Sequence, residues 1–416
     1  MQGFVASFAI QVALVVTGVV AARALGVHAR GELAFLLLVP TVLTTLGGAG
    51  IPVALAYFVA RKPASATSMI RMLLPVGIAQ AVALAAIGMG IVTLGLDLTA
   101  QEVTIAAVIT LLSIPPRLLH VYGVRALQGR RRFLAFNVLR SLPTAGYAAG
   151  ALILFMAGHA TLVALAIAWT ASFAVSGAIT CYVSFREFRD SGTAQGPKLG
   201  ALVRFGLKGA LGWSSPVQAL RIDQTVIGLF LAPAALGLYV VAQAFTNLPR
   251  FISSSVGAVA YPNIAAREDR QQARRTLGRF VLLGAVVSGL LTGSLAIFAG
   301  WLVPFFFGAD FVGAVPTTRI LLLGTFFWCV RIVLADGASG LGLPGLGTVA
   351  EVSSWAILLP ALALLTPPWG IEGVAAALAL SAATSLVVMV AGLMMKGMTP
   401  LAPALGRPAP PPTAGA

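Results

Sequence analysis

The chain has 416 residues, of which 59% are hydrophobic and only 9% are charged. A soluble protein of this size carries a charge on about 25% of its residues. The composition therefore excludes a soluble globular protein and predicts an all-α polytopic membrane protein. Two cysteines and three scattered histidines are too few for a disulfide framework or a histidine metal site, and no G-x-x-x-x-G-K-[ST] phosphate loop occurs. We therefore expect no metal and no cofactor.

Twelve apolar segments follow one another along the chain, each close to the roughly 20 residues that cross a bilayer as a helix. In the first half they are 3–25, 33–59, 72–96, 103–124, 133–157 and 160–185. In the second half they are 207–230, 236–261, 280–307, 314–336, 345–366 and 371–395. The tail, 396–416, is rich in proline and alanine, and we expect it to be disordered.

Most of the basic residues fall in every second connection between these segments. If the N-terminus is cytoplasmic, the inside connections and the tail contain Arg61, Lys62, Arg71, Arg125, Arg130, Arg131, Arg132, Arg186, Arg189, Lys198, Arg204, Lys208, Arg267, Arg270, Arg274, Arg275, Arg279, Lys396 and Arg407. The outside connections contain only Arg23 and Arg30. Cytoplasmic loops of membrane proteins carry the excess of Lys and Arg, so both termini are predicted to be cytoplasmic. The net charge of +15 then faces the anionic inner leaflet rather than nucleic acid.

The two halves of the segment pattern resemble each other. The break after the first segment reads ALGVHARGELAFLLLV and the break after the seventh reads FLAPAALGLYVVAQAF, with glycines at matching positions of the outside turns, Gly31 and Gly237. Because six is even, both halves enter the membrane from the same side, which predicts a two-fold axis along the membrane normal. The predicted domains are an N-terminal six-helix bundle (1–185), a basic cytoplasmic linker (186–206), a C-terminal six-helix bundle (207–395) and the disordered tail (396–416).

Charges inside the predicted spans are confined to some of the helices. The spans 72–96, 160–185, 280–307 and 371–395 have no charged residue in their cores and can face lipid. The others contain Arg117, Arg140, Arg221, Arg250, Arg319 and Arg331, and the acids Asp223, Asp336 and Glu351. Because an unpaired charge in hydrocarbon is costly, this excess of arginine predicts an anionic ligand. The alternative is a structural role in ion pairs or snorkelling near helix ends, which fits Arg319 and Asp336 best.

Five arginines are the candidate substrate-binding residues: Arg117, Arg140, Arg221, Arg250 and Arg331. Counted at about 1.5 Å per residue, all but Arg221 form a band in the cytoplasmic half of the spans. Prolines precede three of them, at Pro116, Pro216 and Pro249. Proline kinks a transmembrane helix and frees carbonyl groups for polar contacts, which supports a polar pathway.

Asp223 is the candidate for ion coupling. It lies two residues from Arg221, so the two side chains point to different faces of a helix and do not pair. Asp223 then needs a partner on another helix, or a proton. The sequence leaves open whether this residue couples transport to an ion or forms a structural ion pair.

Four stretches of the chain carry a family resemblance: ARALGVHARGELAF at 22–35, VRALQGRRRF at 124–133, RFGLKGALGWSSPVQALRIDQTVIGLFLAPAALGLYVVAQAF at 204–245 and LADGASGLGLP at 334–344. In these the chain resembles Wzx-type oligosaccharide flippases, in the superfamily of multidrug/oligosaccharidyl-lipid/polysaccharide exporters. The resemblance spans nearly the whole chain. Asp223 matches the acid of the seventh helix in that family, whereas the arginines match its cationic cavity in kind rather than by position.

The resemblance implies two six-helix bundles in a V shape around a central cavity, and alternating access. The implied cargo is an undecaprenyl-diphosphate-linked oligosaccharide for surface polysaccharide assembly, such as O-antigen, capsule or exopolysaccharide, in the bacterial inner membrane. No chemistry on the cargo is required, so no catalytic residues are expected and the protein is not predicted to be an enzyme. The implied partners are the lipid-linked oligosaccharide, the phospholipid membrane and other polysaccharide-assembly membrane proteins, without nucleic acid.

Two other functions stay open. A drug/cation antiporter of the same fold would need acids in its cavity, whereas arginines outnumber acids in these spans. A membrane glycan polymerase or ligase would need a long outside loop with catalytic residues, whereas every predicted outside loop is short.

Overall fold

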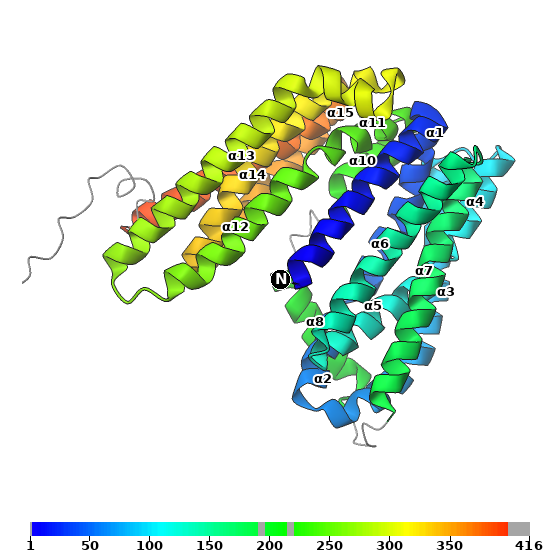
Figure 1. Ribbon diagram of the computed structural model, residues 1–416, viewed down its shortest axis with the longest axis horizontal. Helices are drawn as coiled ribbons and strands as arrows, with labels where there is room; N and C mark the ends of the chain where they lie inside the picture. Colours follow the sequence, from blue (N-terminus) through cyan, green and yellow to red (C-terminus); the bar gives the residue numbers. More distant parts are fainter. Residues whose placement is uncertain (1, 190–195, 214–219, 398–416) are drawn as a thin grey trace, which may run out of the picture. The chain divides into compact units, whose positions relative to one another are not determined.

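The computed structural model describes residues 2–189, 196–213 and 220–397, and within these ranges it is helical and contains no β-strand. As far as these residues extend, each of the twelve predicted segments lies in one or two helices (Figure 1). Eight helical stretches are long and apolar enough to cross a membrane, and two shorter apolar helices accompany them, as far as the described residues extend. The predicted disordered tail from residue 398 onward, and residues 190–195 of the predicted linker, lie outside the described residues.

Two of the predicted connections are kinks, each of which joins two helices that carry a single label. Helix α1 spans Gln2–Gly47 and bends at Gly26, and α15 spans Pro344–Met395 and bends at Gly370. The φ angles there are 69° and 52°, which glycine adopts without the clash that a Cβ atom would cause. Arg23 and Arg30, which were predicted to lie in the outside connection, are in the helical turns on either side of the kink at Gly26, and the side of the membrane that they face stays a prediction.

Other predicted spans are broken into two helices. The fourth span consists of α4 (Gln101–Leu111) and α5 (Ile114–Gly129), and the eighth of α11 (Pro233–Ala244) and α12 (Asn247–Ala265). Pro115, Pro116 and Pro249 lie in the first turn of the new helix. A proline is tolerated there because the first amide groups of a helix have no internal partner. The prolines therefore start helices rather than kink them.

The remaining elements follow the predicted order. They are α2 (Ile51–Arg61), η1 (Pro63–Ser65), α3 (Ala66–Gly95), α6 (Phe133–Met156), α7 (Leu162–Phe188), α8 (Leu199–Trp213), α10 (Ile222–Phe230), α13 (Arg270–Phe307), η2 (Ala309–Ala314) and α14 (Val315–Gly340). Much of the predicted linker 186–206 is helical, because α7 continues to Phe188 and α8 begins at Leu199.

The chain forms two compact units. Unit 1 comprises Met1–Ala244 and Val303–Ala314, and unit 2 comprises Phe245–Leu302 and Val315–Ala416. In unit 1, α1 packs against α6 and α11, and α5 packs against α2 and α7. In unit 2, α12 and α15 pack against α14, and a core around Leu277, Val333 and Met389 joins α13 to them (Figure 1). Helices α8, α10 and α11 thus belong to unit 1, and the division into bundles 1–185 and 207–395 stays a prediction.

The two glycines that the repeat pairs, Gly31 and Gly237, meet in unit 1. A Cβ atom on Gly31 would collide with the carbonyl oxygen of Pro233, and one on Gly237 with that of Val27. Both glycines lie inside helices, α1 and α11, and not in turns as expected. Their missing side chains let the two backbones touch. Elsewhere in unit 1, Nε of Arg23 donates to the carbonyl oxygen of Phe306 at 2.7 Å.

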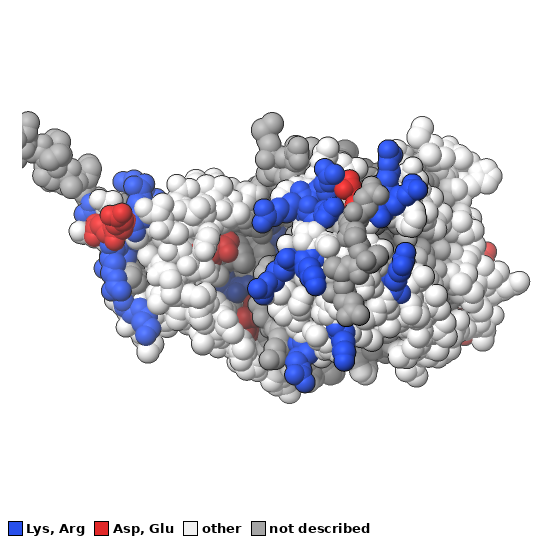
Figure 2. Space-filling model, turned by 90° about the horizontal axis from the view of Figure 1, so that it is seen from below, with Lys and Arg blue, Asp and Glu red and all other residues white. Residues whose placement is uncertain are grey.

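Basic side chains are concentrated at one set of helix ends. Arg61, Arg131 and Arg186 are exposed at the ends of α2, α5 and α7. Figure 2 shows Lys and Arg gathered on the surface that it presents, with few acidic side chains among them. This distribution agrees with the charge bias on which the cytoplasmic orientation of the loops was predicted, and the orientation itself stays a prediction.

Candidate functional site

Arg117 lies in the first turn of α5, directly after Pro116. Its guanidinium group stacks on two aromatic rings of α7, 4.6 Å from the centroid of Phe173 and 5.7 Å from that of Trp169. A cation over an aromatic face is stabilised by about 0.5–2 kcal/mol, which does not neutralise its charge. Within the described ranges, no acidic side chain forms an ion pair with Arg117.

Arg140 lies on α6 and reaches toward the N-terminal part of α1. It donates a hydrogen bond of 3.0 Å to the hydroxyl oxygen of Ser7 and stacks on Phe136 at 5.4 Å. Its Nε is buried and has no hydrogen-bond partner among the described residues. A buried donor without an acceptor costs about 1–3 kcal/mol, so this side chain has capacity for a further ligand.

Arg221 and Asp223 begin α10, and they do not pair with each other. Arg221 is exposed, adopts a left-handed conformation with a φ angle of 43°, and donates to Oε1 of Gln224 at 3.3 Å. Arg117 and Arg221 are close enough for their charges to repel. Two mutually repelling arginines in one unit make a counter-anion favourable.

Asp223 is only 5% exposed, and the partners that it makes lie on α11. Oδ2 of Asp223 accepts hydrogen bonds from the hydroxyl group of Tyr239 at 2.7 Å and from the amide of Gln243 at 2.8 Å. The amide of Gln224 in turn donates to Oε1 of Gln243. The partner on another helix is thus present but neutral, and no basic group pairs with this carboxyl in the part of the chain that the structure describes.

The two candidates of unit 2 differ from each other. Arg250 follows Pro249 in the first turn of α12, lies 5.4 Å from the ring centroid of Trp328, and keeps a buried Nε without a partner among the described residues. Arg331 on α14 is 7% exposed and forms an ion pair of 3.2 Å with Glu351 on α15. Arg331 therefore fits the alternative of a structural role in an ion pair, because it already has a counter-charge.

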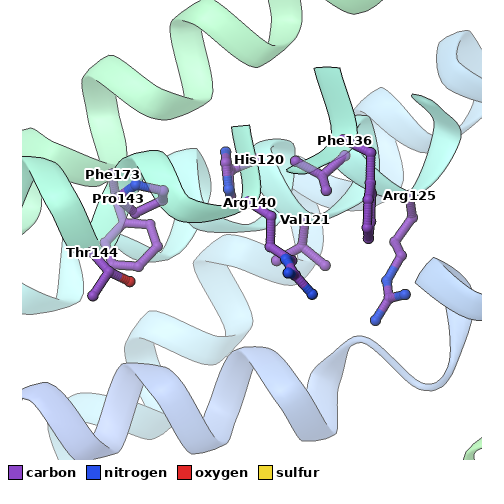
Figure 3. Close-up of a pocket in the computed structure, with 9 residues that line it drawn as sticks. His120, Val121, Arg125, Phe136, Arg140, Pro143, Thr144 and Phe173 are labelled. Carbon is purple, nitrogen blue, oxygen red and sulfur yellow. The ribbon is translucent and has the colours of Figure 1, made fainter. Parts of the chain in front are cut away.

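A cavity of about 220 Å³ opens between α5, α6 and α7 in unit 1 (Figure 3). Its lining residues are His120, Val121, Val124, Arg125, Phe136, Arg140, Pro143, Thr144 and Phe173. In Figure 3 the guanidinium groups of Arg125 and Arg140 extend from neighbouring helices toward the same side. Phe173 connects this cavity to Arg117, which stacks on the same ring.

Arg125 is a cavity residue that the sequence analysis placed in a cytoplasmic loop. It lies in α5, and its guanidinium group donates to Oε1 of Gln128 at 2.8 Å. The spacing of Arg117, Val121 and Arg125 by four residues places all three on one face of a helix, and this spacing could have identified Arg125. The structure thus groups Arg117, Arg125, Arg140 and Arg221 in unit 1, and Arg250 and Arg331 in unit 2.

Residues 20–316 match the family described as polysaccharide biosynthesis protein. The chain belongs to this family. Among curated proteins, this polysaccharide biosynthesis protein resembles the probable low-salt glycan biosynthesis flippase Agl15 of Haloferax volcanii, with 24% identity over 170 residues. The matched segment covers 40% of the present chain and 36% of Agl15, so little more than a third of that relative is matched.

Two solved structures show the fold of this polysaccharide biosynthesis protein. An inward-facing multidrug resistance transporter of the MATE family, in the MOP superfamily, has a TM-score of 0.71 at 13% identity, over 94% of this chain and 98% of that one. The lipid II flippase MurJ in an inward closed conformation has a TM-score of 0.69 at 15% identity, over 94% and 87%. The predicted all-α polytopic membrane fold is confirmed, and the family match confirms the predicted resemblance to polysaccharide biosynthesis proteins.

Proposed function

We propose that this protein is a flippase that moves an undecaprenyl-diphosphate-linked oligosaccharide across the bacterial inner membrane by alternating access. The observation that supports this most is a set of arginines without acidic partners at the starts of broken helices. Arg117 and Arg250 lie in the first turns of α5 and α12, and Arg221 precedes α10. Among the described residues none of the three forms an ion pair.

A helix start is an unfavourable place for a cation, and this strengthens the argument. The aligned peptide dipoles give the N-terminal end of a helix a partial positive charge, which repels a cation and attracts an anion. An arginine there adds its own charge to that of the dipole. Because such positions bind phosphate well, we infer that the ligand is the diphosphate of the lipid carrier. Arginine binds phosphate bidentately and stays charged at every physiological pH.

Transport of this cargo requires no bond to be made or broken. We therefore propose that the protein is a transporter without catalytic residues. The described connections at 96–100, 157–161 and 231–232 are short, which gives no support to a polymerase or ligase with a long outside loop. We further propose that the chain works in the inner membrane with other polysaccharide-assembly proteins.

One observation favours a drug/cation antiporter as the second candidate. Asp223 is buried, and its partners Tyr239 and Gln243 are neutral, so it could bind a proton or a metal cation such as sodium. The same residue also fits ion coupling in a flippase. The charge of the transported molecule separates the two functions, because an antiporter of this kind would export cations.

Reconstitution into vesicles tests the proposal directly. The purified chain is inserted into vesicles that contain a fluorescent undecaprenyl-diphosphate oligosaccharide, and a membrane-impermeant quencher measures the fraction moved between leaflets. We expect movement of this lipid by the native chain and none by empty vesicles. A parallel assay with a cationic dye provides the comparison. Movement of the dye without movement of the anionic lipid would establish the antiporter instead.

The proposed topology, with both termini cytoplasmic and twelve spans, has a separate test. A reporter that is active only in the cytoplasm is fused after Lys396, the first residue beyond α15. We expect full activity, because the basic connections favour the cytoplasmic side. Activity of a reporter that works only outside the cytoplasm would mean an odd number of spans and would contradict the two-by-six repeat.

A further inference from the structure

We propose that the cavity between α5, α6 and α7 is a phosphoryl-binding site, with Arg125 and Arg140 as its two charged ligands. This inference rests on the proposed function only for the source of the phosphoryl group, which would be the diphosphate of the lipid carrier. The evidence is the arrangement of charge, unsatisfied donors and space within unit 1.

The charges of the cavity are unbalanced. Arg125 and Arg140 are close enough to repel each other, and the guanidinium group of Arg117 stacks on Phe173, which lines the cavity. Among the residues that the structure describes, no acid lines the cavity. Two positive charges that face one space in a medium of low dielectric are costly unless an anion separates them. A ligand with negative charge would remove this cost.

The donors of the cavity match the acceptors of a phosphoryl group. The buried Nε of Arg140 has no partner among the described residues, and the hydroxyl group of Thr144 faces the same space (Figure 3). A guanidinium group offers five N–H donors in a planar fork, of which Arg140 uses one on Ser7 and Arg125 one on Gln128 in the bonds described. The donors that remain suit the oxygens of one phosphoryl group.

The size and walls of the cavity restrict the ligand further. Pockets that enclose a drug-sized ligand have volumes of about 300–1,000 Å³, whereas this cavity has about 220 Å³. It is therefore too small for an oligosaccharide but suits a headgroup. Val121, Val124, Phe136, Pro143 and Phe173 make most of its walls apolar. The two arginines would contact the phosphoryl group of a lipid, and the apolar wall beside them would contact the first part of its hydrocarbon chain.

The test measures phosphoryl binding by the full chain in nanodiscs of phosphatidylcholine. Three probes are titrated separately: inorganic pyrophosphate, undecaprenyl phosphate and phosphatidylglycerol. For Arg125→Gln we expect the dissociation constant of the preferred probe to rise about ten- to hundred-fold, the effect of losing one charged hydrogen bond. Arg125→Lys should recover part of the loss. Arg71→Gln is the matched control, because Arg71 is an exposed arginine of α3 outside the cavity.

A second variant separates the cavity from the charge. Val121→Phe fills the space but leaves every arginine in place, and we expect the same loss of binding. If Arg125→Gln and Val121→Phe both bind all three probes as the native chain does, the site does not exist. The site is also contradicted if Val121→Phe binds the probes with native affinity while Arg125→Gln does not. The affinity lost in Arg125→Gln would then be an effect of charge alone and not of the cavity.

The three probes identify the source of the phosphoryl group. Preference for undecaprenyl phosphate supports the carrier lipid, preference for phosphatidylglycerol supports a membrane phospholipid, and binding of pyrophosphate alone supports a soluble phosphate. The vesicle assay gives the independent result for the proposed function. If the cavity binds a probe but the chain moves no lipid, the site is supported and the flippase function is contradicted. If the chain moves lipid and Arg125→Gln moves it equally well, the flippase function is supported and the role of the cavity in it is contradicted.

Discussion

Two arginines, the half-buried Arg140 of unit 1 and the buried Arg331 of unit 2, were predicted to have the same role, and the structure gives them different surroundings. Arg140 contacts a hydroxyl group and an aromatic ring, and one of its donors has no partner in the described part of the chain. Arg331 lies 3.2 Å from Glu351 and is neutralised by it. The difference shows that an intramembrane arginine indicates a ligand site only where no acid of the chain compensates its charge.

The acids of the two units show the same contrast. Glu351 has an arginine partner, whereas Asp223 accepts hydrogen bonds from the neutral groups of Tyr239 and Gln243. In the described part of unit 1, the intramembrane acid Asp223 forms no ion pair with any of the candidate arginines. Unit 2 contains a compensated pair in addition to Arg250. We infer that the charges of unit 1 are available for ligands to a greater degree than the pair of unit 2.

The largest effect is expected when the pair of unit 2 is broken. Arg331→Met leaves Glu351 without its partner in an apolar interior, and breaking a buried pair costs about 3–5 kcal/mol. We expect the lower end of this range, because the side chain of Glu351 is 25% exposed. Thermal unfolding and size-exclusion chromatography of the purified protein should show a lower Tm and less folded protein.

The double variant Arg331→Met, Glu351→Met is the control for this prediction. Removing both charges should restore much of the stability, since an apolar pair of similar volume often replaces a buried ion pair without loss. Lipid movement by the folded fraction should be close to that of the native chain. Unchanged stability in Arg331→Met with lost transport would instead place Arg331 in the binding site.

A smaller effect on stability and a large effect on transport are expected for Arg117. In Arg117→Ala the charge and the stacking on Phe173 are lost, and one charged hydrogen bond to the diphosphate contributes about 1.5–3 kcal/mol. Lipid movement in the vesicle assay should therefore fall by one to two orders of magnitude, with little change in the amount of protein in the membrane. Arg117→Lys should recover only part, because lysine lacks the planar fork. Equal loss of protein and of transport would assign Arg117 a structural role.

Hydrophobic run length was enough to predict where the helices of this fold lie. Each of the twelve segments is helical in the described part of the chain, because a long apolar run must satisfy its backbone hydrogen bonds internally in lipid. Run length does not predict whether a connection is a loop, a bend or a break. The bend at Gly26 and the break before Ile114 depend on single residues in their tertiary context.

The candidate site was predicted less completely, for physical reasons that particular residues illustrate. The type and position of each intramembrane arginine can be read from the sequence, but the partner of Arg331 depends on which faces of α14 and α15 meet. Arg125 was missed because composition alone assigns a basic residue near a helix end to the loop. The contact of Gly31 with α11 was missed because the repeat pairs the two glycines without indicating that they touch.

Asp223→Asn should have a moderate effect, confined to transport. The amide keeps an oxygen that can accept the hydrogen bonds of Tyr239 and Gln243, so folding should be retained while the negative charge is lost. If this carboxyl binds a proton or sodium ion, lipid movement should slow and lose its response to an imposed ion gradient. Reduced protein with a preserved gradient response would indicate a structural role. Normal transport and normal abundance would remove Asp223 from the mechanism.

The smallest effect is expected at the aromatic ring beside Arg250, and it tests whether stacking alone holds an uncompensated arginine. Trp328→Leu removes the face that lies 5.4 Å from the guanidinium group, an interaction of about 0.5–2 kcal/mol. If Arg250 binds the diphosphate, a less well held guanidinium group should weaken binding by a few-fold and leave Tm nearly unchanged. Trp328→Phe keeps an aromatic face, so its affinity for the diphosphate should lie between that of the native chain and that of Trp328→Leu. A large fall in Tm in Trp328→Leu without any change in binding would show that Arg250 and Trp328 stabilise unit 2, as Arg331 and Glu351 do.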